Sequence, residues 1–260
     1  SFRENGYKII PIVNEKLQIL DLINFRKVRS YLPIDAVIMA GGEGKRLRPL
    51  TNKTPKPLLK IGEKTIIEHN LDRLSSFGIE DFWISINYLG EKIEKYLNYD
   101  SRIRFIKEDK PLGTIGAITK IKKFRSEYIL LTNSDLLTNI DYEKFFKDFI
   151  DHDSDFAVLT IPYKINVPYA VLETLNGNVK SFKEKPSYTY QSNGGVYLMK
   201  RKVLELVPND TFFNATDLLE KLIKNKYKVI SFPFTGYWLD IGRHEDFERA
   251  QKEIYTINFK

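Results

Sequence analysis

Short apolar runs alternate with amphipathic segments over the first half of the chain. The run Ile34–Ala40 is almost wholly apolar and stops abruptly at Gly41-Gly42, which is typical of a buried parallel strand that leads into a glycine-rich turn. The same criteria predict strands at 82–86, 103–106 and 128–132, and helices at 65–77, 91–97 and 142–150. This alternation indicates an α/β fold with a doubly wound, mostly parallel sheet.

The pattern changes after residue 155, where apolar stretches follow one another with few helical segments between them. Asn176-Gly177 is a strong hairpin signal between two of these stretches. Strands are predicted at 156–161, 169–175, 179–182, 195–199 and 228–232, and helices at 215–224 and 245–255. The sequence therefore predicts a mixed sheet to which a layer of antiparallel strands is added.

Residues 1–33 stand apart from the rest of the chain. Strands are predicted at 8–13 and 17–22, and a helix at 25–30. Two strands and one helix are too little to fold alone. We therefore divide the chain into an N-terminal segment, 1–33, and a main domain, 34–260.

Composition narrows the classes of function. The chain contains no cysteine, which excludes disulfides, thiolate metal sites and a cysteine nucleophile and is compatible with a cytoplasmic location. No apolar run is long enough to span a membrane. The formal net charge is +7, but the lysines are dispersed and form no basic tail, so we expect small phosphate ligands and no nucleic-acid partner.

A glycine-rich turn follows the first predicted strand of the main domain. Gly41, Gly42 and Gly44 would let backbone N–H groups approach a phosphate closely, and Lys45 and Arg46 add positive charge. The spacing fits neither a P-loop nor a dinucleotide-binding fingerprint, which would need a third glycine at 47. On this segment alone, a plain tight turn remains an alternative.

Lys56 lies between two prolines in the stretch Thr54–Leu58. Proline fixes φ and stiffens the backbone, so this lysine is held in place more firmly than an ordinary surface lysine. That restraint suits a catalytic cation, although a solvent-exposed loop lysine is the alternative.

These two segments together resemble the signature of the sugar-phosphate nucleotidylyltransferase family, which reads G-G-x-G-x-R-L-x-P-L-T followed by P-K-P-L. Further motifs follow in the family's order, namely Pro111–Thr114 after Glu108, Asn133–Asp135, Glu184–Pro186, Asn193–Tyr197 and Trp238–Gly242. The resemblance covers most of the chain, from about residue 34 to 247. It implies a Rossmann-like α/β domain whose added antiparallel layer binds the sugar.

The resemblance also implies the reaction, in which a sugar 1-phosphate attacks the α-phosphorus of a nucleoside triphosphate and pyrophosphate leaves. Asp135 follows a buried strand, where α/β sheets place ligands, although a turn or helix-capping aspartate is the plain alternative. In the family's pattern Asp135 and Asp240 hold Mg²⁺, Arg46 binds the β- and γ-phosphates, and Lys56 neutralises the α-phosphate. These four residues are the expected catalytic set.

The remaining site residues are implied in two groups. Those expected to bind the nucleotide are Ala40, Gly41, Gly42, Gly44, Lys45, Arg46, Glu108 and Gly113. Those expected to bind the sugar phosphate are Ala170, Glu184, Lys185 and Asn193. Two residues depart from the family's pattern: Ala170 replaces a glycine, and Arg243 stands after Gly242 where a small hydroxyl residue is common. Both bear on which sugar is bound.

The stretch from Glu108 to Thr114 resembles the E-x-x-P-L-G-T segment of mannose-1-phosphate guanylyltransferases and of their heptose and glucosamine relatives. It favours GTP, with a mannose-, heptose- or glucosamine-type sugar 1-phosphate and a product used in surface glycans. Transfer of uridylyl or another nucleotide, and a catalytically inactive regulatory homologue, remain alternatives. A homo-oligomer is possible. Residues 9–21 also resemble the last strands of a CBS domain, and a CBS pair precedes the catalytic domain in some relatives; an unrelated N-terminal extension is the alternative.

Overall fold

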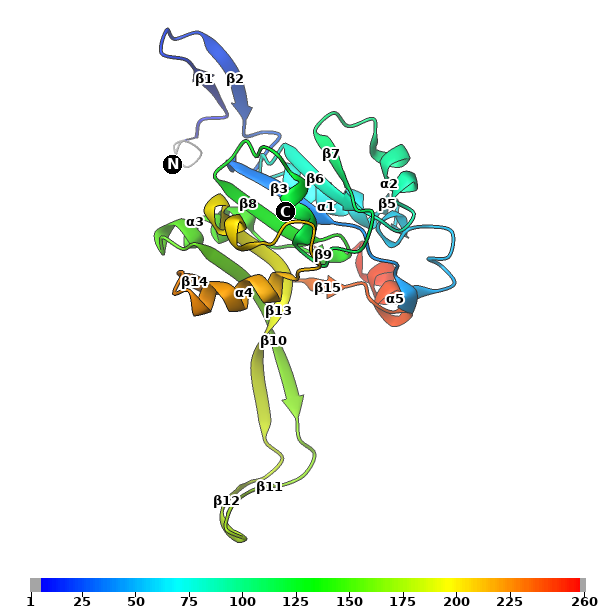
Figure 1. Ribbon diagram of the computed structural model, residues 1–260, viewed down its shortest axis with the longest axis vertical. Coiled ribbons are helices and arrows are strands. Elements are labelled where there is room, and N and C mark those ends of the chain that lie inside the picture. Colours follow the sequence, from blue (N-terminus) through cyan, green and yellow to red (C-terminus); the bar gives the residue numbers. More distant parts are fainter. Residues whose placement is uncertain (1–5, 258–260) are drawn as a thin grey trace.

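The computed structural model describes residues 6–257 and is built around one seven-stranded mixed sheet (Figure 1). The strand order is β14 (Val229–Pro233), β10 (Phe156–Asn166), β13 (Ser187–Lys200), β8 (Tyr128–Asn133), β3 (Ile34–Met39), β6 (Asp81–Ile86), β7 (Ile103–Lys107). Every neighbouring pair is parallel except those that involve β13, which runs against both β10 and β8. The predicted mixed, mostly parallel sheet is confirmed.

Helices cover both faces of this sheet. They are α1 (Ile66–Ser75), α2 (Gly90–Leu97), α3 (Tyr142–Asp151), α4 (Ala215–Lys224) and α5 (His244–Glu253). Alternate residues of β3 point to opposite faces: Ile38 packs with apolar residues of α1, α2 and α3, whereas Val37 packs with those of α4 and of two 3-10 helices, η3 (Gly116–Lys120) and η4 (Arg201–Leu206). Two cores on the two faces define the doubly wound architecture.

Several short elements were not predicted from the sequence. They are β4 (Lys60–Ile61), β5 (Lys64–Thr65), β9 (Leu136–Thr138), β15 (Trp238–Asp240), η1 (Lys45–Leu47) and η2 (Lys56–Leu58). The strands β9 and β15 pair with each other in antiparallel fashion. A third, smaller apolar cluster joins α5 to this region through Leu47, Ile61 and Leu239.

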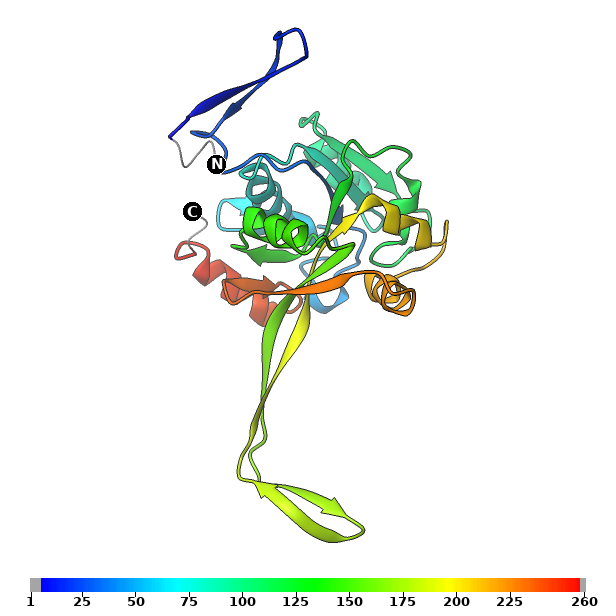
Figure 2. The same ribbon diagram turned by 90° about the vertical axis from the view of Figure 1, so that its left-hand side faces the viewer.

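A long ribbon projects from the sheet, and we call its residues 162–194 the arm. β10 and β13 stay paired beyond the sheet as far as Asn166 and Ser187, and β11 (Val171–Leu175) and β12 (Asn178–Lys183) form a hairpin at the tip. The turn at Asn176-Gly177 is confirmed. The antiparallel strands are therefore present as predicted, but Figures 1 and 2 show them projecting away from the sheet instead of covering it.

A second hairpin precedes the sheet, formed by β1 (Ile9–Val13) and β2 (Ile19–Asn24). The helix predicted at 25–30 is wrong. The side chain and carbonyl of Asn24 bind the amides of Arg26 and Lys27 and close a single turn, after which the Arg29 amide donates to the Ser76 carbonyl next to α1. Residues 1–5 lie outside the described residues. Within the described part of the chain, no helix is long and apolar enough to cross a bilayer.

Candidate active site

A cavity of about 370 Å³ opens at the carboxyl ends of β3 and β8. This is the edge at which open α/β sheets bind ligands, because loops from neighbouring strands diverge there. The lining residues are Met39, Ala40, Gly41, Gly42, Lys56, Pro57, Glu108, Pro111, Leu112, Gly113, Thr114, Asn133, Ser134, Asp135, Phe212 and Asn214.

The glycine-rich turn forms one wall of the cavity. Gly41 and Gly42 line it, and a side chain at Gly41 would meet Glu108 Oε1 at 3.0 Å. Gly44 has φ +61°, and a Cβ atom there would lie 2.9 Å from Thr51 Cγ2. The Thr51 hydroxyl donates to the Gly44 carbonyl at 2.9 Å. Gly44 therefore shapes the turn, whereas the two preceding glycines leave room for a ligand.

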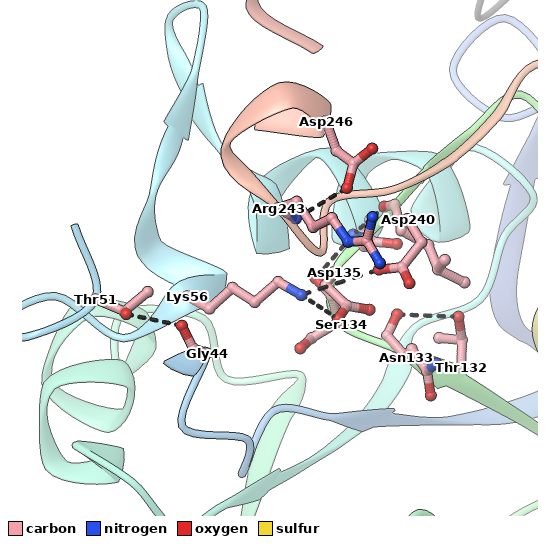
Figure 3. A network of polar contacts seen from close by, with 12 residues as sticks. Gly44, Thr51, Lys56, Thr132, Asn133, Ser134, Asp135, Asp240, Arg243 and Asp246 are labelled. Atoms are coloured by element: carbon pink, nitrogen blue, oxygen red, sulfur yellow. Dashed lines mark hydrogen bonds and ion pairs between the residues drawn. The ribbon is translucent and has the colours of Figure 1, made fainter. Parts of the chain in front are cut away.

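Lys56 lies at the base of the cavity, on η2, and only 8% of its surface is exposed. Its ammonium group forms an ion pair with Asp135 Oδ2, and its Nζ atom lies 3.9 Å from Asp240 Oδ1 (Figure 3). The lysine thus lies between the two aspartates that the sequence analysis singled out. The alternative of a solvent-exposed loop lysine is wrong.

The short pair β9–β15 brings the two aspartates together. Asp135 immediately precedes β9, Asp240 ends β15, and Asp240 is registered with Leu136. The Ile241 amide donates to the Asp135 carbonyl at 3.0 Å. The buried side-chain amide of Asn70, on α1, donates to the Leu136 carbonyl at 2.9 Å and so holds β9 against α1.

Asp135 and Asp240 have the chemistry of a site for a hard divalent cation. The Oδ1 atom of each is buried and has no hydrogen-bond partner. Burial, together with the negative charge of Asp135, raises the pKa of Asp240, and this effect would be relieved by a cation between them. Among the described residues no group of three or more histidine or acidic side chains could hold a metal. Two carboxylates therefore fit Mg²⁺ only if phosphate oxygens and water complete its shell.

Arg46 lies beside this pair. Its Nη2 atom would be 3.2 Å from a Cβ atom placed on Gly242, and its charge lowers the pKa of Asp240 against the larger effect of burial. Arg46 and Arg243 share an open cleft with His244 and Glu245. Lys45, in contrast, is exposed and ion-paired with Glu43, with 3.1 Å between Nζ and Oε1.

Glu108 and Gly113 frame the opposite wall. The Glu108 carboxylate is buried and accepts hydrogen bonds from the Ser85 hydroxyl and, at 2.8 Å, from the Leu112 amide. Gly113 has φ +76°, and a Cβ atom there would lie 2.6 Å from the Phe213 carbonyl. Glu108 therefore already holds the loop that follows it, and each carboxylate oxygen keeps one further lone pair for a ligand.

The four residues expected to bind the sugar phosphate lie elsewhere. Asn193 lies at the base of the arm, where its side chain accepts from the Gly195 amide at 2.9 Å and donates to the Tyr197 hydroxyl at 2.7 Å. Ala170, Glu184 and Lys185 lie on the exposed arm, and none of them lines the cavity.

Of the residues expected to bind the nucleotide and the metal, the structure places most around this cavity, with Arg46 and Asp240 beside it, whereas Lys45 is exposed. The residues expected to bind the sugar phosphate do not line the cavity.

Phe212 and Asn214 line the cavity but were not singled out from the sequence. Both come from the segment before α4, and the Asn214 side chain accepts from the Thr114 amide at 3.3 Å while it caps the helix. A capping asparagine before an amphipathic helix is visible in a sequence, but nothing local shows that this helix begins at the cavity.

Comparison with known proteins agrees with this geometry. Residues 35–256 match the family described as "Nucleotidyl transferase". The chain belongs to this family. A D-glycero-alpha-D-manno-heptose 1-phosphate guanylyltransferase of Aneurinibacillus thermoaerophilus is 33% identical over 85% of this chain and 98% of its own length. The catalytic subunit beta of mannose-1-phosphate guanylyltransferase from Drosophila melanogaster is 29% identical over 82% of this chain, which spans 60% of that protein.

A solved structure supports the same assignment. HddC from Yersinia pseudotuberculosis, in a crystal structure described as complexed with GMP-PN, superimposes with a TM-score of 0.66 and 28% identity. The match covers 85% of this chain and 99% of that one. The family resemblance stated from the motifs is therefore confirmed.

Proposed function

We propose that this protein is a sugar-1-phosphate guanylyltransferase, which transfers GMP from GTP to a sugar 1-phosphate and releases pyrophosphate. The observation that carries the proposal is the placement of buried Lys56 between Asp135 and Asp240, at the end of a cavity walled by Gly41 and Gly42. A nucleotide whose phosphates point toward Lys56 would have its base near the opposite wall.

Charge neutralisation is the main task, because two anionic substrates must meet. Lys56 is restrained by Pro55 and Pro57, so its ammonium group can turn from Asp135 to an α-phosphate oxygen without a large rearrangement. Arg46 lies where it would bind the phosphates that leave as pyrophosphate. The backbone at Gly41 and Gly42 allows the nucleotide to approach the strand end closely.

Enzymes of this family generally use a divalent metal, and we propose that Mg²⁺ is held by Asp135 and Asp240. When bound, the ion supplies positive charge to phosphate oxygens of both substrates. The two buried Oδ1 atoms without hydrogen-bond partners support this assignment. The aspartates also orient the ammonium group of Lys56 before the substrates bind.

The guanine assignment rests on the E-x-x-P-L-G-T resemblance of residues 108–114 and on relatives whose names specify guanylyl transfer. Glu108 lines the cavity and keeps lone pairs that could accept the N1–H and N2–H₂ donors of guanine. A heptose or mannose 1-phosphate is proposed as the sugar because these are the substrates that the relatives' names give.

The test is a substrate matrix. GTP, UTP, CTP, ATP and dTTP are each offered with heptose, mannose, glucosamine and glucose 1-phosphates in the presence of Mg²⁺, and pyrophosphate release is measured. We expect the highest kcat/KM with GTP. No pyrophosphate from any pair would overturn the proposed reaction, and a preference for UTP would replace the guanine assignment with the uridylyl alternative.

A further inference from the structure

The arm is the part of the molecule that the proposed reaction leaves unexplained. It projects away from the sheet (Figures 1 and 2). It carries Ala170, Glu184 and Lys185, which the family resemblance implies are sugar-phosphate residues but which do not line the cavity of their own copy. We propose that the arm of one copy of this chain reaches the active-site cavity of a second copy, and that Lys185 there supplies the cation for the sugar phosphate. This inference rests on the proposed function.

A single copy leaves no cation assigned to the phosphate of the sugar, because Arg46 in the adjoining cleft is assigned to the leaving pyrophosphate and Lys56 to the α-phosphate. Among the described residues that line the cavity, Lys56 is the only cation, and it is already paired with Asp135. Two phosphorylated substrates would meet there. The arm, in contrast, contains four lysines and two glutamates. Lys164, Lys180 and Lys185 have no ion-pair partner within residues 6–257, so the arm offers the charge that the cavity needs.

The base of the arm fixes its direction and opposes folding back onto its own cavity. The Trp238 indole donates to the Gly194 carbonyl at 2.9 Å, and Asn193 ties Gly195 to Tyr197. A Cβ atom on Gly195 would lie 2.8 Å from Asn133 Nδ2, so this point is tightly packed. Beyond it, the ladder from Ile161 to Asn166 is continuous. Closure within one copy would break these contacts.

The two faces of the arm differ in polarity, as expected for a ribbon that packs one face against another surface. The cross-strand pairs Tyr163–Tyr190 and Ile165–Tyr188 share one face, whereas the pair Lys164–Thr189 lies on the other. Tyr163 and Tyr190 are more than half exposed. An isolated two-stranded ribbon is marginally stable in water, so an uncovered aromatic face favours a partner.

The cavity offers a matching surface. Phe212 lines the cavity and is 60% exposed, whereas every other described phenylalanine outside the arm is buried or half-buried. A standard protein interface uses about 20–30 residues a side. The arm has a similar length, and mutual exchange of arms about a two-fold axis would close the assembly as a dimer.

Complementation tests this arrangement in the active enzyme. Asp135→Asn and Lys185→Ala chains carrying different tags are co-expressed, and the mixed dimer is purified by both tags. If arms are exchanged, one of its two sites combines an intact body with an intact arm, so kcat/KM for the sugar 1-phosphate should be about half the wild-type value per dimer. A mixed dimer of Asp135→Asn with Lys56→Ala, both in the body, is the control and should stay inactive.

If kcat/KM of the Asp135→Asn/Lys185→Ala mixed dimer were only half that of the Lys185→Ala dimer, the exchange of arms would be overturned, because each body would then use its own arm. A monomer in light scattering at assay concentration would also overturn it.

Cross-linking gives a readout that does not depend on activity. The chain has no cysteine, so Lys185→Cys and Phe212→Cys can be placed in separately tagged copies and joined with a short bis-maleimide. We expect a covalent pair that carries both tags, and none when Tyr99→Cys, which is exposed but lies outside the cavity, replaces Phe212→Cys. A further chain carries both cysteines. Linkage found only within that chain, and never between the separately tagged copies, would overturn the proposal even if the enzyme transfers GMP.

Discussion

The cavity around Lys56 and the arm are held in opposite ways. The cavity is assembled from segments between residues 39 and 214, and the side chains of Lys56, Glu108 and Asn214 are each held by a contact from another part of the chain. The arm makes mainly local contacts, between one strand and its neighbour. The body is therefore organised for nucleotide binding before any ligand arrives, whereas the arm needs a second surface to place its lysines.

The largest effect should come from the aspartates of the cavity. Asp135→Asn and Asp240→Asn each remove a charge from the proposed Mg²⁺ site, and we expect kcat to fall about a hundredfold or more. Both side chains are partly exposed at the cavity, so the thermal unfolding midpoint should change little. Steady-state kinetics across a Mg²⁺ titration, with calorimetry on the same samples, measures both effects.

Asp151→Asn, at the exposed end of α3, is the matched control and should leave kcat unchanged. Normal turnover by either cavity variant at saturating Mg²⁺ would mean that the two-aspartate site is wrong.

The second prediction separates one lysine of each region. Lys56→Ala should lower kcat by about a hundredfold with a smaller effect on KM, because its charge matters most as charge shifts in the transition state. Lys185→Ala should mainly raise KM for the sugar 1-phosphate, by about tenfold, since it loses one charge-assisted contact. Lys164→Ala, on the same arm, is the control for charge alone. The reverse pattern would show that the two roles have been exchanged.

The sequence predicted the cavity better than the arm, and the reason is physical. Buried parallel strands are apolar runs, so β3 and β8 and the position of Asp135 after a strand could be seen directly. The pairing of β9 with β15 could not, because three-residue strands carry no periodic pattern. That pairing places Asp240 beside Asp135, and only the ordered family motifs pointed to it.

The direction of the arm depends on contacts at its base that no local pattern encodes. The strands of its tip hairpin and the Asn176-Gly177 turn were predicted, because alternation and turn residues are local signals. The parts of β10 beyond residue 161 and of β13 before residue 195 were not predicted. The Trp238 hydrogen bond that sets the direction of the arm joins residues that are far apart in the sequence. The Asn193 hydrogen bond lies within β13, where the strand pattern gives no sign of it. The helix predicted at 25–30 failed for a related reason, since a tertiary contact to Ser76 ends the turn.

The third prediction compares two glycines with similar backbone angles, one in each region. Gly195 has φ +71° and lies against Asn133, whereas Gly177 has φ +80° at the arm tip with nothing within 4 Å of a Cβ atom. Gly177→Ala should cost about 1–2 kcal/mol of unfolding free energy from backbone strain alone. Gly195→Ala adds a steric clash, so we expect about 2–4 kcal/mol. Urea unfolding measures both, and equal losses would contradict tight packing at the arm's base.

The last and smallest effect concerns how the cavity reads the base. The Glu108 carboxylate holds the Leu112 amide and the Ser85 hydroxyl, and it faces the cavity with spare lone pairs. Guanine presents two adjacent donors that one carboxylate can accept together, whereas uracil presents one. Glu108→Gln replaces one acceptor with a donor, so the ratio of kcat/KM for GTP to that for UTP should fall by about tenfold.

Ser85→Ala provides the comparison, because it removes a donor behind the carboxylate and leaves the carboxylate in place. If Glu108 reads guanine directly, Ser85→Ala should lower kcat/KM for both nucleotides alike, and only Glu108→Gln should change their ratio. If Glu108 acts only by shaping the loop through Leu112, both variants should weaken GTP and UTP equally. A GTP preference untouched by Glu108→Gln would keep guanine as the base and assign its recognition to the backbone of residues 111–114, which line the same wall.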